Sequence, residues 1–396
     1  MSDTLAPRAL LAAPKPPVPP APQLIVSVAR RHGISPFRQF RQMLQLRYGQ
    51  NRLDFHEYYG NQVYRPEVSA DERREFVGEK GSWKLNTRLS PLALTNGLRV
   101  FVRDKVLYGA TIAQLGFPTT RTQAMISRER AYGNIPVLRT AEEIETFLLE
   151  QARYPLFAKP EVGSGSVGSA MIAGIDRNAR VLELLNGARV DLKSFAAEAI
   201  EDYAEGLILQ DAIEQHQALS EIAGRAVGTI RVVTVMEDDS PKLLYALWKI
   251  PAPTAMSDNY WQDGSMIGEI DNASGVLRQC RRGSGPDQEV IEAHPVSGRS
   301  FREVRIPFWA DTVDLACRAH HLLPAFGVFG WDIAITDDGP LIIECNANPH
   351  HMLYQLATGR GILSRDMAPV LDRVADRARA MIAERRELAK KARKAK

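Results

Sequence analysis

Residues 330–346, GWDIAITDDGPLIIECN, combine side chains that could bind a cation. Two short strand patterns flank an Asp-Asp-Gly turn, and counting outward from Asp338 places Asp332 opposite Glu344. Because side chains alternate along a strand, Asn346 shares the face of Glu344. Two carboxylates held this close repel each other unless a cation lies between them, and their oxygen ligands suit magnesium. The alternative is a surface hairpin whose Asp and Glu are merely solvated.

The opposite face of this hairpin is apolar and able to pack on a core. We expect it to carry three residues from each strand: Trp331, Ile333 and Ile335 against Leu341, Ile343 and Cys345. The sequence therefore predicts a hairpin that is buried on one side and acidic on the other.

A loop rich in small residues follows Lys159, which ends a strand pattern. The backbone amides of this loop, residues 160–168, are able to contact phosphate oxygens. Its glycines match the GxGxxG pattern of dinucleotide folds, but that fold needs a helix next, and the following SAMIAGI indicates a strand. A glycine-rich loop between two strands is the arrangement that covers the phosphates of nucleotide triphosphates. Lys159, just before the loop, would neutralise phosphate charge. The alternative is a plain flexible hairpin.

Arg231 interrupts the otherwise apolar strand pattern of residues 229–235. A buried guanidinium requires an anionic partner or a full set of hydrogen bonds. A nucleotide phosphate would satisfy it, and so would an internal ion pair with one of the Asp or Glu residues.

The composition is that of an ordinary globular protein, with 45% hydrophobic and 24% charged residues and a net charge of +3 over 396 residues. This near balance gives no case for nucleic-acid binding. Cys280, Cys317 and Cys345 lie too far apart for a paired-cysteine metal site or a disulfide framework, so we expect a reducing cytoplasm. We expect neither a membrane span nor a signal peptide, because the apolar runs are too short.

The chain exceeds one typical core, and its helix and strand patterns predict an α+β protein with antiparallel sheet. Strands are predicted at residues 155–159, 168–175, 207–210, 228–236 and 242–249, besides the two arms of the hairpin. We expect five segments: a disordered proline-rich leader (1–22), a helical cap (23–97), a part with the glycine loop (98–210), a part with the acidic hairpin (211–363) and an amphipathic helix with a frayed basic tail (364–396).

The order and spacing of the motifs resemble those of the ATP-grasp superfamily over residues 98–361. The matching motifs are Asp104-Lys105, Gly116-Phe117-Pro118, Lys159 with its loop, residues 210–213, Arg231, Asp332 and Glu344-Cys345-Asn346. More narrowly, Glu57-Tyr58-Tyr59, the run GTIRVVTV and residues 257–264 are similar to the sugar-transfer associated ATP-grasp branch. The resemblance implies two α+β subdomains that grip ATP, with an N-terminal helical extension.

The resemblance also implies roles for individual residues. ATP would be bound by Lys105, Lys159, Gly163, Ser164, Gly165, Ser166, Gly168, Gln210, Asp211, Ala212, Ile213 and His216, with residues 210–213 at the adenine and His216, or alternatively Glu214, at the ribose. Asp332, Glu344 and Asn346 would hold two magnesium ions, with Glu344 bridging them. Arg231 and Lys159 would act in catalysis, Arg231 by stabilising the transferring phosphoryl group.

The reaction implied is that of a carboxylate-amine ligase, in which a substrate carboxylate attacks the γ-phosphate and an amine then displaces phosphate from the acyl phosphate. The partners would be a small-molecule or glycan carboxylate, such as a sugar acid or amino acid, and an amine. A kinase, and a non-catalytic ATP-binding partner of a glycosyltransferase system, stay open as alternatives, as does the oligomeric state.

The substrate contacts are predicted from two polar segments. Asn259 and Asp263 lie in a glycine-bearing stretch between strand patterns, and Asn348 follows the predicted metal ligands, as do His350 and His351. A surface turn explains the first segment equally well. The two histidines could instead begin the next helix, and their adjacent spacing makes a poor transition-metal site.

Overall fold

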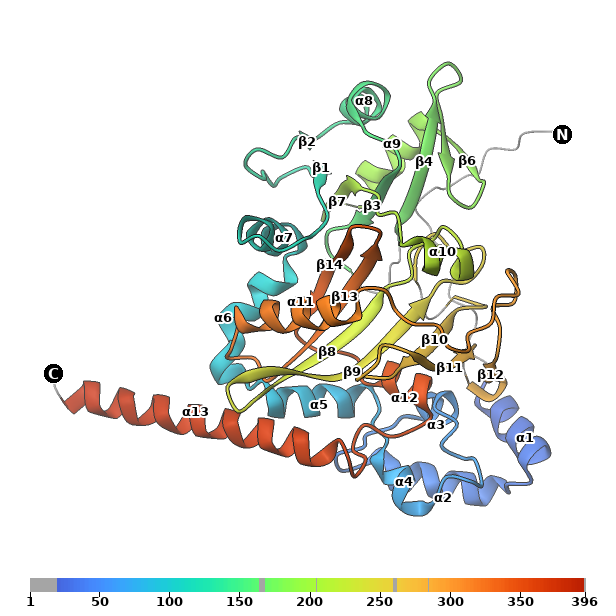
Figure 1. The fold of residues 1–396 in the computed structure, drawn as a ribbon, viewed down its shortest axis with the longest axis vertical. Helices are drawn as coiled ribbons and strands as arrows, with labels where there is room; N and C mark the ends of the chain where they lie inside the picture. The colour runs from blue at the N-terminus through green and yellow to red at the C-terminus, as the bar shows by residue number, and fades with distance from the viewer. Residues whose placement is uncertain (1–19, 164–167, 204, 259–261, 284, 395–396) are drawn as a thin grey trace.

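A computed structural model describes residues 20–163, 168–203, 205–258, 262–283 and 285–394 of the chain. Within them, two seven-stranded sheets are flanked by helices, which confirms the predicted α+β class (Figure 1). Residues 1–19 of the predicted leader lie outside the described residues. The leader prediction is wrong at its end, because helix α1 already begins at Ala21. In these described ranges no helix combines the length and apolar character needed to cross a membrane.

The N-terminal segment is helical, as predicted. Its helices are α1 Ala21–His32, α2 Pro36–Arg47, α3 Phe55–Gly60, α4 Ala70–Glu75, α5 Glu79–Leu89, α6 Leu92–Arg103 and α7 Lys105–Gln114. Tyr58, Tyr59 and Tyr64 are buried in a small core with α1 and α2, so this aromatic block is structural. Helix α5 instead packs Leu85 and Leu89 against the second sheet.

The first sheet has the strand order β2-β1-β7-β3-β4-β5-β6, with antiparallel pairing except between β1 and β2. Its strands are β1 Thr122–Ile126, β2 Val137–Leu138, β3 Leu156–Pro160, β4 Ala170–Asp176, β5 Val181–Leu184, β6 Arg189–Asp191 and β7 Leu207–Asp211. One face is covered by α8 Ala141–Thr146, the π-helical turn Phe147–Gln151 that continues it, and α9 Leu192–Glu201. The other face of this sheet packs against Val106 of α7 and borders the cavity described below.

The second sheet is antiparallel throughout, with the order β12-β11-β10-β9-β8-β13-β14. Its strands are β8 Ile230–Glu237, β9 Ser240–Ile250, β10 Met266–Ile270, β11 Leu277–Arg282, β12 Glu289–Ile291, β13 Val328–Thr336 and β14 Gly339–Asn346. The remaining helices are α10 Gln217–Ala223, the 3-10 turn Gly285–Asp287, α11 Trp309–His321, α12 Met352–Thr358 and α13 Ala368–Lys394. Helix α11 packs on one face of this sheet, and α5, α12 and α13 pack on the other (Figure 1).

The β13–β14 hairpin has the predicted register at its acidic end, where Asp332 pairs with Glu344 and Gly330 with Asn346. A bulge follows Asp332, so that Ile333 pairs with Ile342. The predicted apolar face is therefore right for one strand and only partly right for the other. The core contains Trp331, Ile333, Ile335, Ile342 and Cys345, whereas Leu341 and Ile343 are only partly buried.

The C-terminal helix differs from its prediction in length. We predicted a frayed tail after Leu388, but α13 continues as a helix to Lys394. Its first half packs Leu371, Val374 and Ala378 on the body, and its second half extends away from it (Figure 1). The segment boundaries proposed at residues 97, 210 and 363 stay a prediction.

Candidate functional site

A cavity of about 1050 Å³ lies between α7 and the sheet ends of β3, β7 and β14. It brings together predicted site residues from four distant parts of the sequence. The predicted residues that line it are Lys105, Lys159, Gly163, Gln210, Glu344, Asn346 and Asn348. Two cations, one end of the glycine loop and the acidic end of the hairpin thus share one space.

The two lysines reach the cavity from different elements. The Asp104 carboxylate caps α7 by accepting from the Leu107 amide at 2.9 Å, which makes Lys105 the first residue of that helix. The Lys105 Nζ donates to the carbonyls of Pro160 and Gly163, both at 3.3 Å, and so holds the start of the glycine loop. These bonds place a cation next to the loop that we predicted to contact phosphates.

Lys159 is nearly enclosed, with 9% of its surface exposed at the end of β3. Burial lowers the pKa of Lys159 to about 8, while Glu344 opposes the shift and Lys105 adds to it. Its ammonium group is therefore desolvated in the cavity and gains from an incoming anion.

The start of the glycine loop is anchored by Glu161, which the sequence analysis did not single out. Its buried carboxylate accepts hydrogen bonds from Arg130 and Tyr132, and Arg130 also binds Asp104. This network joins the loop to α7. Of the predicted loop residues, Ser164, Gly165 and Ser166 lie outside the described residues, and Gly168 is buried away from the cavity.

Arg231 and Asp332 form a bidentate ion pair between adjacent strands β8 and β13. Arg231 Nε donates to Asp332 Oδ1 at 2.6 Å and Nη2 donates to Oδ2 at 3.0 Å, and both side chains are nearly fully buried. Burial opposes the charged forms, but the pairing raises the pKa of Arg231 and lowers the pKa of Asp332. The internal ion pair is thus the alternative realised for Arg231, and neither residue lines the cavity.

A second buried cation, Lys249, extends this network. Its Nζ lies 3.3 Å from Asp332 Oδ2 and 2.9 Å from Asp258 Oδ2, and Asp258 also accepts from Thr229. Two cations therefore balance two carboxylates. Lys249 was not predicted as a site residue, although it interrupts an apolar strand pattern just as Arg231 does.

Glu344 and Asn346 are the predicted metal ligands that face the cavity. Among the described residues, no cation pairs with Glu344 within 4.0 Å, and the buried Nδ2 of Asn346 has no hydrogen-bond partner. No group of three His, Cys, Asp or Glu side chains in the described ranges could hold a metal ion. Magnesium commonly uses one or two carboxylates with phosphate oxygens and water, so this sparse donor set fits it.

The residues predicted for the adenine and ribose are only partly at the cavity. Gln210 lines it, but Asp211, Ala212, Ile213 and His216 do not. Asp211 accepts hydrogen bonds from Gln123 and Arg153, at 2.7 and 3.0 Å. His216 Nδ1 accepts from the Ala218 amide at 3.1 Å and caps α10, so the described contacts of His216 are structural.

Of the residues predicted for substrate binding, likewise, only some line the cavity. Asn348 lines the cavity, whereas Asp263 is exposed on a turn away from it, and Asn259 lies outside the described residues. His351 is buried directly before α12, where its nitrogens bond to Tyr245 at 2.9 Å and to Asn86 at 2.8 Å. The interpretation of the histidines as the start of a helix is therefore correct for His351.

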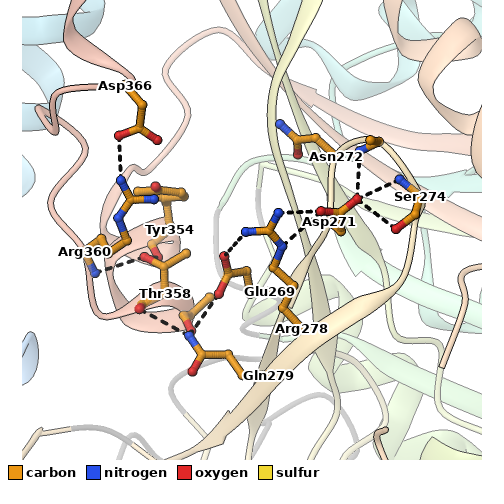
Figure 2. A network of polar contacts seen from close by, with 12 residues as sticks. Glu269, Asp271, Asn272, Ser274, Arg278, Gln279, Tyr354, Thr358, Arg360 and Asp366 are labelled. Atoms are coloured by element: carbon orange, nitrogen blue, oxygen red, sulfur yellow. Dashed lines mark hydrogen bonds and ion pairs between the residues drawn. The ribbon is translucent and has the colours of Figure 1, made fainter. Parts of the chain in front are cut away.

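Another polar network joins β10 and β11 to α12 and the chain after it (Figure 2). Gln279 Nε2 donates to Glu269 at 2.9 Å and to the carbonyls of Ala357 and Thr358 at the end of α12. Arg278 pairs with Asp271 and holds the pKa of that carboxyl well below its usual range. None of these residues lines the cavity, so we assign the network to the fold.

Comparison with known proteins identifies a family to which the sequence matches and several solved structures with low sequence identity to it. Residues 84–370 match the family described as sugar-transfer associated ATP-grasp. No curated protein matches the chain at a significant level. The chain is similar to the D-alanine-D-alanine ligases of Coxiella burnetii (13% identity, 74% of this chain and 62% of that chain, TM-score 0.41) and Helicobacter pylori (13%, 75% and 69%, 0.41).

A third similar structure is N5-carboxyaminoimidazole synthase from Aspergillus clavatus in complex with ADP and 5-aminoimidazole ribonucleotide (13% identity, 69% of this chain and 52% of that chain, TM-score 0.35). The chain spans less than two thirds of the Coxiella and Aspergillus proteins. Likenesses this distant do not transfer a residue role, so the roles below depend on this chain's own geometry.

Proposed function

Because the chain belongs to the sugar-transfer associated ATP-grasp family, we propose that it is an ATP- and magnesium-dependent carboxylate-amine ligase. In the proposed reaction a substrate carboxylate takes the γ-phosphoryl group of ATP, and an amine displaces phosphate from the acyl phosphate to leave an amide. The observation that carries the proposal is the cavity in which Lys105 and Lys159 meet Glu344 and Asn346.

The lysines have the properties that phosphate binding requires. Lys159 is desolvated, so pairing its ammonium group with a phosphate is worth more than the same contact in water. Lys105 ties the loop start to α7 and adds a second positive charge. Gly163, beside Lys105 on the cavity wall, lets the backbone approach the phosphates closely.

The acidic end of the hairpin, which also lines the cavity, suits a cation. We assign Glu344 and Asn346 as the residues that hold magnesium together with phosphate oxygens. When bound, magnesium would supply charge neutralisation at the phosphates. Asp332 lies beside Glu344 on the hairpin, and we assign it the role of holding Arg231 in place.

The test is release of ADP and phosphate from the purified protein with magnesium-ATP, across pools of uronic acids and amino acids, with mass spectrometry of the products. A product mass equal to that of both substrates less one water supports the ligase. A stable phosphorylated product without amide would identify a kinase instead. ATP binding with no turnover in any pool or in cell extract would favour the non-catalytic alternative.

A further inference from the structure

Helices α5 and α6, which precede the ATP-binding residues in sequence, form one wall of the same cavity. The residues of this wall are Trp83 and Thr87 from α5 and Leu92, Asn96, Arg99, Val100 and Arg103 from α6. On α6, positions 92, 96, 99 and 103 fall on one helical face, while Leu94, Thr95 and Val102 face the core. Helix α6 contacts both α7 and β14, so this wall adjoins the hairpin end (Figure 1).

The wall carries two arginines without an acidic partner among the described residues. Arg99 is half-buried and held by neutral groups: its guanidinium donates to Thr95 Oγ1 at 3.0 Å and to the Ser90 carbonyl at 2.9 Å. Its Nη1 lies 3.4 Å from the carbonyl of Ala347, between Asn346 and Asn348. Arg103 is exposed one turn further along α6. Their charges remain available to an anion, which guanidinium groups bind well.

The same wall carries an exposed aromatic ring. Trp83 leaves 55% of its surface exposed, whereas Trp248 and Trp331 are fully buried. Trp83 lines the cavity together with the arginines, and an exposed indole is a suitable apolar platform for the C–H face of a sugar ring, with polar groups left for the edges. The cavity volume of about 1050 Å³ slightly exceeds the range of roughly 300–1000 Å³ typical of ligand sites, which leaves room for a second ligand beside a nucleotide.

We propose that Trp83, Arg99, Arg103 and Asn348 form the subsite for the phosphoryl acceptor, and that this acceptor is an anionic sugar stacked on Trp83 with its charge on the arginines. The assignment rests on the proposed ligase function and names its substrate class. It gives the N-terminal helices a direct part in substrate binding.

The test is titration of galacturonate, galactose 1-phosphate and galactose into the wild-type protein, with and without a non-hydrolysable ATP analogue, followed by calorimetry and tryptophan fluorescence. We expect the anionic sugars to bind at least tenfold more tightly than galactose. Arg103→Gln should weaken anion binding about tenfold, as expected for the loss of one charge-assisted contact. Trp83→Ala should remove the fluorescence response. Because the proposed ligase phosphorylates a carboxylate, galacturonate should bind at least as tightly as galactose 1-phosphate. Tighter binding of the phosphate sugar would overturn the assignment of the subsite to the phosphoryl acceptor.

The matched control is Arg88→Gln, which removes an exposed charge of α5 that pairs with Asp372 at 3.1 Å and does not line the cavity. This variant should bind the sugars as the wild type does. Three outcomes would overturn the proposal. The wild-type protein could bind galactose as tightly as the anionic sugars, or it could bind neither anionic sugar. Alternatively, Arg103→Gln could bind the anionic sugars with wild-type affinity. Magnesium-ATP is titrated separately: its failure to bind would refute the ligase function and leave the sugar subsite to be judged by the sugar titrations.

Discussion

Arg231 and Asp332 neutralise each other across β8 and β13, with Nε–Oδ1 and Nη2–Oδ2 distances of 2.6 and 3.0 Å. Lys249 adds a second cation 3.3 Å from the same carboxylate. Our argument that the acidic pair on the hairpin needs a metal ion for charge balance is therefore wrong for Asp332. It still applies to Glu344, which has no ion-pair partner in the described chain.

This difference predicts that Asp332→Asn destabilises the protein strongly. The substitution leaves two buried cations with a single remaining carboxylate, Asp258, and breaking a buried pair in this way costs about 3–5 kcal/mol. Urea unfolding of the variant at pH 7 measures the loss. A free energy of unfolding within 1 kcal/mol of the wild type, taken as roughly the scale of an exposed pair, would contradict the described network.

Glu344→Gln should behave in the opposite way. Its carboxylate has no ion-pair partner among the described residues and lines the cavity, so replacing it should change the free energy of unfolding by less than about 0.5 kcal/mol. Magnesium-dependent ADP release should fall to background, because the proposed metal site loses its charged ligand. Normal turnover in a folded Glu344→Gln protein would refute the metal assignment.

The acidic end of the hairpin was predictable because period-two alternation and a short turn determine which residues pair. The bulge after Asp332 was not, since the alternation of side chains does not encode an extra residue, and Leu341 and Ile343 were misplaced as a result. The ion pair of Arg231 was left open because its partner lies 101 residues away. Lys249 carried the same signal, a charge in an apolar strand, and was overlooked.

The strands with strong apolar patterns, β3, β4, β7, β8 and β9, were predicted to within two residues at each end. The short or polar strands β2, β5, β6, β10, β11 and β12 were missed, because neighbouring strands stabilise them more than their own sequence does. The cavity wall of α5 and α6 was likewise not predictable. Trp83 and Arg99 reach it because α5 and α6 pack beside residues 346–348, some 250 positions later in the chain.

The depressed pKa of Lys159 predicts that ATP binding takes up protons. With a pKa of about 8 in the free protein, Lys159 is half-protonated at pH 8, and a phosphate beside it would raise that pKa. Binding at pH 8 should therefore take up roughly half a proton, and affinity should fall as pH rises above 8. Calorimetry in two buffers of different ionisation enthalpy measures this uptake. Lys159→Arg keeps the charge but cannot titrate, so it should bind ATP without the uptake.

Two buried histidines predict a loss of stability in acid. Burial lowers the pKa of His320 to about 4 and of His351 to about 3, so the unfolded chain binds more protons than the folded one below pH 6.5. The free energy of unfolding should fall by about 3 kcal/mol for each histidine between pH 6.5 and 4. Urea unfolding across that range should give a smaller dependence of the free energy of unfolding on pH for His320→Gln than for the wild type. An equal pH dependence in the two proteins would rule out this origin of acid sensitivity.

Gly327 lies where the end of α5 packs against the second sheet, and a larger side chain there should disturb this packing. A Cβ at this position would lie 2.2 Å from the Leu89 carbonyl oxygen at the end of α5 and 2.8 Å from Val374. The Gly327 amide also donates to Ser90 Oγ at 2.9 Å, so the backbone has little freedom to move away. Gly327→Ala should therefore destabilise the protein by about 1–3 kcal/mol.

Gly97→Ala, in an exposed part of α6 with open space around it, is the control and should be neutral or stabilise by up to about 1 kcal/mol. Comparable urea midpoints for the two variants would show that α5 is not docked against Gly327.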